Sequence, residues 1–379
     1  MPKPKKIAWV EGFPAHYSSE LHCRLEELFP NRLRFFYFEG NKYVRDERKF
    51  EHTILPNSCD VISNTDSLRT FRLIKKINDF DPDCIISYTH NPRTLWLIAI
   101  IYIFMKRKVC YRGDTNIQDI FQRPKWWQFL KRLIFNIYLS KMWRLLYMGS
   151  ENRNFYVWAT NRSFFNEKKI FMPLPHNHNH FKEASNICQR IDKHPFTIIT
   201  VSRLVALKRI DLLIDAVVLL PVEMRKNIVC NIVGDGMEKE SLMQKTRQLN
   251  VSDNFNFMGA IPSDEVVESY NDADVLVLLS DHEPFGLVIN EALSMGIPVI
   301  APYWVGAVTD LVIDGVTGIA LQDNKKETIA KAIIQLYESN DYGKHLGLAG
   351  QKHIEAMGFT LETTIESFCK LVSDLDIEQ

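Results

Sequence analysis

The chain of 379 residues lacks the sequence features of several protein classes. Its seven cysteines are odd in number and scattered, which argues against a disulfide framework or a zinc ribbon and favours free thiols in a reducing cytosol. The longest apolar run, Leu95–Met105, has 11 residues. A membrane-spanning helix needs about 20, so we expect a buried helix there. Residues 7–12 are too few and too polar for the core of a secretory signal, so the expected location is the cytoplasm.

The P-loop, dinucleotide-binding and metal-binding motifs are also missing. The chain has no Gly-Lys-Ser/Thr sequence, which argues against a P-loop kinase or ATPase. The turn Gly234-Asp235-Gly236 is followed by Lys239, where a dinucleotide fingerprint has its third glycine. His176, His178 and His180 alternate without a nearby carboxylate or cysteine to complete a metal site, so we expect solvated or capping side chains.

The composition is typical of a globular protein with two domains. Hydrophobic residues make up 46% and charged residues 24% of the chain, and its length suits two domains of about 150–190 residues. Residues 1–190 carry 31 Lys and Arg against 18 Asp and Glu, whereas residues 191–379 carry 15 against 28. We expect the basic half to face an anionic partner; the alternative is an unequal surface composition without a role.

The second half alternates apolar strands with helices, the pattern of a parallel sheet that is covered on both faces. The expected strands are Phe196–Ser202, Asn227–Val233, Phe255–Met258, Asp274–Leu279 and Ile297–Ala301. The expected helices are Ile210–Leu220, a polar helix that ends near Leu249, Ser263–Tyr270 and Leu287–Met295. Ligands of such a sheet bind beyond the carboxyl ends of its strands.

The first half repeats this pattern less regularly. Its expected strands are Ile7–Val10, Arg34–Phe38, Cys84–Tyr88, Val109–Arg112 and Leu145–Met148, with a helix from about Ser18 to Leu28. Residues 40–64 show no periodicity and are expected to be irregular. The polar stretch Pro173–Asp192 is the expected linker, so the predicted domains are residues 1–185 and 186–358.

The most informative segment runs from Asp281 to Ala292. It follows a strand and opens a helix, and the free N–H groups of a helix N-terminus form an anion site. Gly286 allows the backbone to approach a phosphate closely. Glu283 and Glu291 would repel a phosphate, so we expect them to accept hydrogen bonds from vicinal hydroxyls of a sugar and a ribose. The alternative is a helix-start charge and a surface residue.

Two cations follow the first strand of this half. Arg203 and Lys208 are placed to clamp a diphosphate and to neutralise a leaving group. The alternative is a solvated basic turn before a helix, and that is the expected state of Arg209.

Together these motifs resemble glycosyltransferase family 4 of the GT-B fold. The resemblance covers residues 196–322 and depends on Arg203, Lys208, Gly234-Asp235-Gly236, Phe257-Met258-Gly259, Glu283-Pro284-Phe285-Gly286, Glu291 and Pro298. It implies an α/β chain of two Rossmann-like domains that face each other across a cleft, and a final helix within residues 359–379 that crosses back to the N-terminal domain. It also implies sugar transfer from a nucleotide diphosphate sugar with retention at the anomeric carbon, and no required metal or cofactor.

The resemblance assigns roles to individual residues. It assigns Arg203 and Lys208 to the diphosphate, Glu283 to hydroxyls of the donor sugar, and Glu291 to the ribose. The other donor contacts that it implies are the loop at Gly12, the turn at Gly234, the backbone near Ile261, and the amides of Phe285, Gly286 and Leu287. The residues expected to act in catalysis are Glu283, Arg203, Lys208 and Asp114.

The sequence departs from the family where many members carry a histidine. Tyr111–Asn116 occupies that region, so Asp114, Arg112 or His90 is the candidate for the missing role. We expect same-face attack, in which the departing phosphate takes the acceptor proton; the alternative is a double displacement with Asp114 as the nucleophile. Val305-Gly306 replaces the usual glycine pair, which leaves recognition of the sugar ring open.

Residues 106–144 hold ten basic residues against Asp114 and Asp119, with aromatic residues interleaved. This combination suits the headgroup region of an anionic membrane and a lipid-linked or anionic glycan acceptor. The alternative is an aromatic core with only the charges facing water, and nucleic acid is not expected because no nucleic-acid motif accompanies the patch. The residues assigned to the acceptor or the membrane are His16, His90, Arg112, Lys125, Trp126, Lys131 and Arg132.

The predicted function is therefore a retaining glycosyltransferase of the hexosyltransferase type, with a role in cell-surface polysaccharide or glycolipid assembly at the inner membrane face. Two rival functions remain. One is a sugar-nucleotide epimerase or a glycan phosphorylase on the same architecture. The other is a non-catalytic protein that binds sugar nucleotides, for which Glu283 is dispensable.

Overall fold

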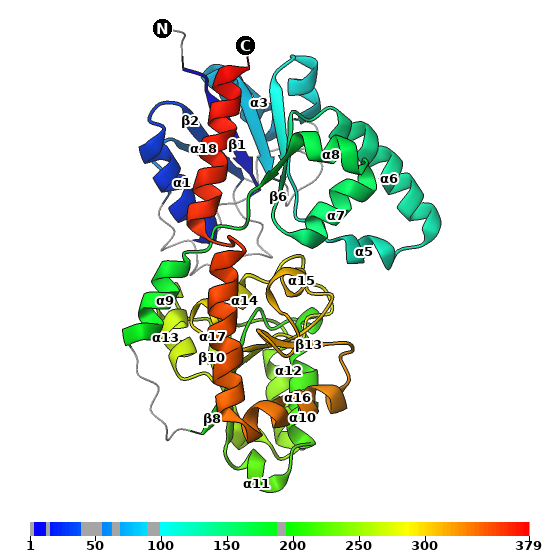
Figure 1. Cartoon of the computed structure of the whole chain (residues 1–379), viewed down its shortest axis with the longest axis vertical. Coiled ribbons are helices and arrows are strands. Elements are labelled where there is room, and N and C mark those ends of the chain that lie inside the picture. The colour runs from blue at the N-terminus through cyan, green and yellow to red at the C-terminus, as the bar shows by residue number, and fades with distance from the viewer. Residues whose placement is uncertain are drawn as a thin grey trace. The chain divides into compact units, whose positions relative to one another are not determined.

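The computed structural model describes residues 4–12, 16–38, 55–62, 69–88, 99–187 and 195–378 (Figure 1). The chain divides into two compact units. Unit 1 contains Met1–Pro175 together with Thr360–Gln379, and unit 2 contains His176–Phe359. The first boundary falls inside Pro173–Asp192, the predicted linker, but residues 178–187 of that stretch form a helix of unit 2.

Unit 1 is built on a parallel sheet with the strand order β3-β2-β1-β4-β5-β6-β7. Its strands are β1 (Ile7–Glu11), β2 (Leu33–Phe38), β3 (Cys59–Ile62), β4 (Cys84–Tyr88), β5 (Lys108–Arg112), β6 (Arg144–Tyr147) and β7 (Lys169–Phe171). The central strands β1 and β4 are buried along their whole lengths, as both faces of a parallel sheet are covered by helices. The strand order reverses between β1 and β4, which makes this point the topological switch of unit 1.

The last helix of the chain belongs to unit 1. The helices of this unit in the described residues are α1 (His16–Leu28), α3 (Arg69–Phe80), the stretch 99–104, α5 (Ile117–Phe121), α6 (Lys125–Ser140), α7 (Ser150–Ala159), α8 (Arg162–Lys168) and α18 (Leu361–Ile377). α18 lies against α1 (Figure 1) and also contacts β7, and Thr364 Oγ1 donates a hydrogen bond of 3.2 Å to the Pro173 carbonyl. Phe368 stacks on Trp9 of β1 with ring centroids 6.0 Å apart, so the end of the chain completes the apolar core.

Unit 2 holds a second parallel sheet, with the order β10-β9-β8-β11-β12-β13. Its strands are β8 (Phe196–Val201), β9 (Ile228–Val233), β10 (Phe255–Gly259), β11 (Val275–Val277), β12 (Val299–Pro302) and β13 (Gly318–Leu321). Its helical segments are α9 (His178–Ile187), η1 (Ala206–Lys208), α10 (Ile210–Val218), α11 (Val222–Arg225), α12 (Lys239–Gln248), η2 (Ser252–Asn254), α13 (Ser263–Asn271), α14 (Leu287–Ser294), α15 (Val308–Leu311), α16 (Lys326–Glu338) and α17 (Asn340–Ala356). The strand order reverses between β8 and β11, the switch point of unit 2.

All strands predicted from the sequence are present, but β3, β7 and β13 were not predicted. β3 falls within residues 40–64, so the prediction of irregular structure is wrong for Cys59–Ile62. Asp60 of this strand is buried. It accepts a hydrogen bond of 2.7 Å from Arg34 Nε and forms an ion pair with Lys76. A charged residue in a short edge strand hides the apolar pattern on which the prediction depends.

The apolar run Leu95–Met105 is not a buried helix throughout. Residues 99–104 are helical, and Ala99 and Tyr102 are buried, but Phe104 is 83% exposed. The expectation of a buried helix is therefore wrong for the outer face of this segment. No helix within the described residues is both long and apolar enough to cross a bilayer.

Two of the three alternating histidines are buried in unit 2. Ser294 Oγ lies 2.7 Å from His176 Nε2 and 2.7 Å from His178 Nδ1, and His178 Nε2 lies 2.8 Å from Glu355 Oε1. This network joins the start of α9 to α14 and α17. The expected solvated role is wrong for His176 and His178, whereas His180 is exposed.

Buried histidines should make the fold sensitive to acid. Burial lowers the pKa of His176 to about 3, and burial together with the charge of Arg112 lowers the pKa of His22 to about 3. Each histidine titrates near pH 6.5 in the unfolded chain, so the unfolded state binds more protons and stability falls as the pH drops from about 6.5 towards 3.

We expect each of these two histidines to lower the free energy of unfolding by about 2 kcal/mol between pH 7 and pH 5. Urea unfolding at both pH values checks this. His22→Gln and His176→Gln should each lose about that much less stability than the unsubstituted protein, because glutamine does not titrate. Variants with the pH dependence of the unsubstituted protein would show that these side chains are not held neutral.

Candidate functional site

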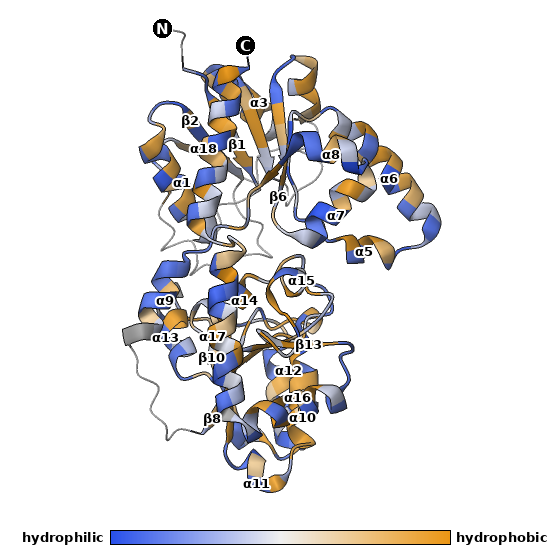
Figure 2. Cartoon of the chain, viewed as in Figure 1, coloured by the Kyte–Doolittle hydropathy of each residue, from blue (hydrophilic) through white to orange (hydrophobic). Residues whose placement is uncertain are grey.

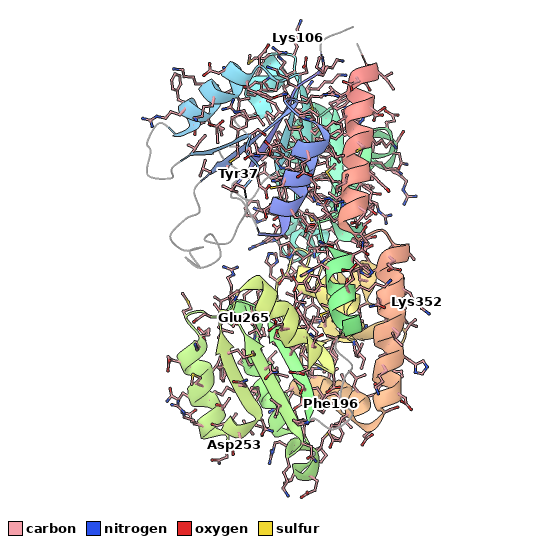
Figure 3. All side chains as sticks on the ribbon, turned by 90° about the vertical axis from the view of Figure 1, so that its left-hand side faces the viewer. Tyr37, Lys106, Phe196, Asp253, Glu265 and Lys352 are labelled. Carbon is pink, nitrogen blue, oxygen red and sulfur yellow. The ribbon has the colours of Figure 1, made fainter. Side chains whose placement is uncertain are left out.

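The residues predicted to bind the donor lie at one edge of the unit 2 sheet. Because the strands are parallel, their carboxyl ends share this edge. The residues that follow these ends are Arg203 after β8, Gly234 after β9, Ile261 after β10 and Glu283 after β11. Figure 3 shows Phe196 at the amino end of β8 and Glu265, on the helix that follows β10, at the opposite edge. The edge includes the switch point between β8 and β11, where open α/β sheets bind ligands.

Lys208 and Glu283 meet across this switch point. Lys208 ends η1 in the β8 loop, Glu283 lies in the β11 loop, and Lys208 Nζ forms an ion pair with Glu283 Oε2. Ser280 Oγ donates to the same carboxylate oxygen at 3.4 Å. The two charged side chains are only 13% and 17% exposed. The topology therefore brings a cation and a carboxylate, 75 residues apart in the chain, to one point.

Arg203 and Arg209, which lie in the same loop as Lys208, differ in their contacts. Arg209 adopts a left-handed backbone conformation (φ 51°), and its guanidinium binds both Asp211 and Asp281, at 3.1 Å and 3.0 Å. Arg203 is exposed and forms no ion pair with any residue that the structure describes. Arg209 is thus engaged by two acids, as its predicted solvated role allows, and the predicted role of Arg203 at the diphosphate stays a prediction.

Gly234 is required by close backbone packing. Its φ is +133°, and a Cβ atom would lie 1.9 Å from the Ser202 carbonyl oxygen. Its N–H donates to the Gly259 carbonyl at 2.8 Å. This glycine, which follows β9, therefore packs against the residue after β8 and binds the end of β10, and its predicted contact with the donor stays a prediction.

The Glu283 loop is held by the loop after β12. Gly306 N–H donates to the Glu283 carbonyl at 3.1 Å, and Ala307 N–H donates to the Phe285 carbonyl at 2.7 Å. A Cβ atom on Gly306 would lie 2.0 Å from the Pro284 carbonyl oxygen, so only glycine allows this approach. The Val305-Gly306 sequence departs from the family pattern. In this structure Gly306 packs against the Glu283 loop and holds it in place.

The same loop leads into α14. Gly286 has a φ of +98° and caps the helix N-terminus, and Leu287 begins the helix. The side chain of Phe285 is buried and stacks on Phe359 with ring centroids 5.9 Å apart, which fixes the loop against the unit. The arrangement of strand, glycine loop and helix N-terminus predicted for this segment is present, whereas ligand contacts of the three amides remain predictions.

Glu291 has a partner that the sequence did not reveal. The carboxylate accepts a hydrogen bond of 2.9 Å from the hydroxyl of Tyr270 on α13. Burial raises the pKa of Tyr270 well above its usual value, and the charge of Glu291 raises it further, so Tyr270 stays a neutral donor. Ile261 precedes α13, so the residues predicted for the base and the ribose border one helix. Tyr270 belongs to no recognisable motif, because in the sequence it fits the apolar pattern of α13.

The carboxyl edge of the unit 1 sheet holds Gly12 and Asp114, which follow β1 and β5. Asp114 is half-buried. Burial raises the pKa of Tyr17 and of Tyr88, and the negative charge of Asp114 adds to both shifts. The side chain of His16 and all of His90 lie outside the described residues.

Arg112 is a buried residue at the end of β5. It is 1% exposed and donates hydrogen bonds of 2.7 Å to the Pro173 carbonyl and 3.3 Å to the Met172 carbonyl. Its guanidinium lies over the Tyr88 ring, 4.9 Å from the centroid. A side chain in this position cannot reach a membrane surface, so its assignment to the membrane face is wrong.

Glu11, a buried acid beside Gly12, was not among the predicted site residues. Glu11 is fully buried, accepts a hydrogen bond of 3.4 Å from Ser18 Oγ, and lies 3.7 Å from His22 Nε2. His22 Nδ1 lies 2.7 Å from the Tyr37 hydroxyl. The only sequence signal for this cluster is an acid at the end of an apolar strand.

The other residues assigned to the membrane lie on α6. Lys125, Trp126 and Arg132 are exposed. Lys131 lies over the Trp127 ring at 4.8 Å, and burial lowers its pKa. The alternative of a purely aromatic core is wrong for Trp126, which is 69% exposed.

Comparison with known proteins identifies unit 2. Residues 182–353 match the family model "Glycosyl transferases group 1". D-inositol 3-phosphate glycosyltransferase of Corynebacterium diphtheriae is 30% identical over 205 residues, which is 52% of this chain and 47% of that protein. N-acetyl-alpha-D-glucosaminyl L-malate synthase of Bacillus anthracis is 29% identical over 150 residues, 40% of this chain and 38% of that protein. The chain thus spans less than half the length of these curated relatives.

The fold of the whole chain also has solved counterparts. The structure of Anabaena Alr3699/HepE in complex with UDP and glucose superposes with a TM-score of 0.75. The match covers 98% of this chain and 100% of that one. At 18% sequence identity it shows a similarity of fold alone. Residues 182–353 therefore belong to the group 1 glycosyl transferases, and the chain as a whole has the GT-B fold that the sequence predicted.

Proposed function

We propose that the protein transfers a sugar from a nucleotide diphosphate sugar to an acceptor hydroxyl, with retention at the anomeric carbon. The Lys208–Glu283 pair at the switch point, beside the N-terminus of α14, is the observation that carries this proposal. Lys208 and Arg203 are cations for the diphosphate, and Glu283 is an acceptor for sugar hydroxyls. Glu291, oriented by Tyr270, is the acceptor for the ribose diol.

The proposed step needs charge stabilisation more than acid–base groups. The bond between the anomeric carbon and the phosphate oxygen breaks, and a bond from the acceptor oxygen forms on the same face of the sugar. The acceptor proton passes to the departing phosphate oxygen, and the nucleoside diphosphate leaves. Lys208 and Arg203 stabilise the charge that grows on the diphosphate, so the scheme requires neither a metal nor a further cofactor.

The proposed acceptor is anionic or lipid-linked. The names of two curated relatives include inositol 3-phosphate and L-malate, both anions. Residues 1–190 of this chain carry 31 basic against 18 acidic residues, a charge that suits such a partner. A role in cell-surface polysaccharide or glycolipid assembly, in the cytoplasm at the inner membrane face, follows as the physiological part of the proposal.

A panel of UDP-, GDP-, ADP- and dTDP-sugars tests the donor. One class should raise the apparent stability of the full chain by about 3 kcal/mol at roughly 100 times its dissociation constant, because only the folded state binds it. UDP-sugars are the first choice, since the Anabaena structure holds UDP. Glu283→Gln should lose most of the sugar-dependent part of this shift and keep the part due to the nucleotide.

Product analysis separates the rivals. NMR of the product should show the anomeric configuration of the donor. Isomerisation of the sugar nucleotide without acceptor indicates an epimerase, and phosphate-dependent cleavage indicates a phosphorylase. Unchanged turnover in Glu283→Ala would contradict the role given to this carboxylate.

A further inference from the structure

α6 has an apolar stripe on the side opposite its buried face. The buried residues Gln128, Phe135, Tyr138 and Leu139 attach the helix to unit 1. The exposed apolar residues are Trp126 (69%), Phe129 (71%), Leu130 (47%), Leu133 (50%), Ile134 (41%) and Ile137 (59%). Their spacing of three and four residues places them on one face of the helix. Figure 2 shows hydrophobic colour along much of α6 and the neighbouring α5.

This stripe is large for a surface that meets only water. It runs from Trp126 to Ile137, a length of about 17 Å at 1.5 Å per residue. Phe121, at the end of α5 just before α6, is 52% exposed and is a further exposed aromatic residue. Soluble monomers rarely expose contiguous apolar patches of this kind without a partner.

The charges around the stripe indicate what the partner is. Between Asp119 and Arg144 the sequence contains five basic residues and no acidic one; the basic residues are Arg123, Lys125, Lys131, Arg132 and Lys141. Lys125 and Arg132 are exposed on α6 itself. A protein partner would have to match the apolar stripe and also place acidic groups against these cations, whereas a bilayer with anionic headgroups meets both at once.

We propose that α6 lies in the plane of an anionic membrane, with Trp126, Phe129, Leu133 and Ile137 in the boundary between headgroups and acyl chains. Lys125 and Arg132 then bind lipid phosphates beside the stripe. This inference rests on the proposed function, because a lipid-linked acceptor is the reason for the enzyme to bind a membrane. It assigns the contact to the apolar side chains and makes the cations secondary.

Vesicle sedimentation with the full chain tests the inference. The vesicles are phosphatidylcholine alone and phosphatidylcholine with about one phosphatidylglycerol in four lipids. The unsubstituted protein should bind the anionic vesicles. The triple variant Trp126→Ser, Phe129→Ser and Leu133→Ser should bind at least about tenfold more weakly. Lys125→Glu with Arg132→Glu should weaken binding and remove its salt dependence.

Phe71→Ser is the matched control. Phe71 is 67% exposed on α3, which lies next to β3 at the far edge of the same sheet, so its loss should leave vesicle binding unchanged. The replaced side chains on α6 are exposed, so circular dichroism should show intact variants. Vesicle binding that survives the triple substitution overturns the inference, and so does an unsubstituted protein that ignores vesicles and dimerises through α6. The assay contains no sugar donor, so such a result leaves the transferase proposal standing.

Discussion

Lys208→Ala is expected to lower kcat about 100- to 1000-fold in an assay of sugar transfer. The proposed role of Lys208 is to stabilise negative charge on the departing diphosphate, and removal of one such electrostatic contact typically has an effect of this size. The side chains of Lys208 and Glu283 are only 13% and 17% exposed. The substitution therefore also leaves the Glu283 carboxylate without its cation in a largely buried position. We therefore expect weaker donor binding in addition to slower turnover.

Arg209→Ala is the matched control for this result. Arg209 is the next residue in the same loop, but its guanidinium is engaged by Asp211 and Asp281. Its removal should change kcat less than about threefold, because exposed ion pairs contribute about 1 kcal/mol or less. Lys208→Arg should recover part of the activity. Equal losses at both positions would mean that the loop, not the Lys208 charge, determines the rate.

Gly306→Ala is expected to lower the free energy of unfolding by about 2–3 kcal/mol and to weaken donor binding at least about tenfold. The new methyl group would lie 2.0 Å from the Pro284 carbonyl oxygen, so the Glu283 loop has to move. That movement breaks the hydrogen bonds from Gly306 and Ala307 that fix the loop. Urea unfolding and titration with the donor measure the two effects.

Gly343→Ala serves as the control for the added methyl group. Gly343 lies within α17, and the nearest atom to its new Cβ is Leu336 Cδ2 at 3.9 Å, an ordinary contact. Alanine is favoured over glycine in a helix by up to about 1 kcal/mol, so this variant should be slightly more stable. Full donor affinity in Gly306→Ala would contradict the view that the 305–307 loop positions Glu283.

The parallel sheets and the edge that carries the site were predictable because their signals are local. Apolar runs marked the strands of unit 2, and parallel strands place the residues that follow them on one edge. Lys208 and Glu283 were therefore expected near each other although 75 residues separate them. The strand β3 was not predictable, since Asp60 is tolerated there only through Arg34 and Lys76, which lie elsewhere in the chain.

Partners distant in sequence explain the other differences. His176 and His178 are buried because Ser294, 118 and 116 residues further on, lies within hydrogen-bond distance of both. The segment that forms α6 is rich in aliphatic and aromatic residues on two opposite sides. A helical period cannot tell which of two apolar sides faces the core, so the exposed stripe needed the structure.

Hydrogen–deuterium exchange of the full chain, with and without the nucleotide sugar that stabilises it, tests the central claim most directly. We expect slower exchange in peptides that cover residues 202–209 and 281–291, which carry Lys208 and Glu283. Glu283→Gln should reduce that protection in both loops. Tight donor binding that leaves both loops unprotected and slows exchange elsewhere would contradict a donor site at this edge of the sheet.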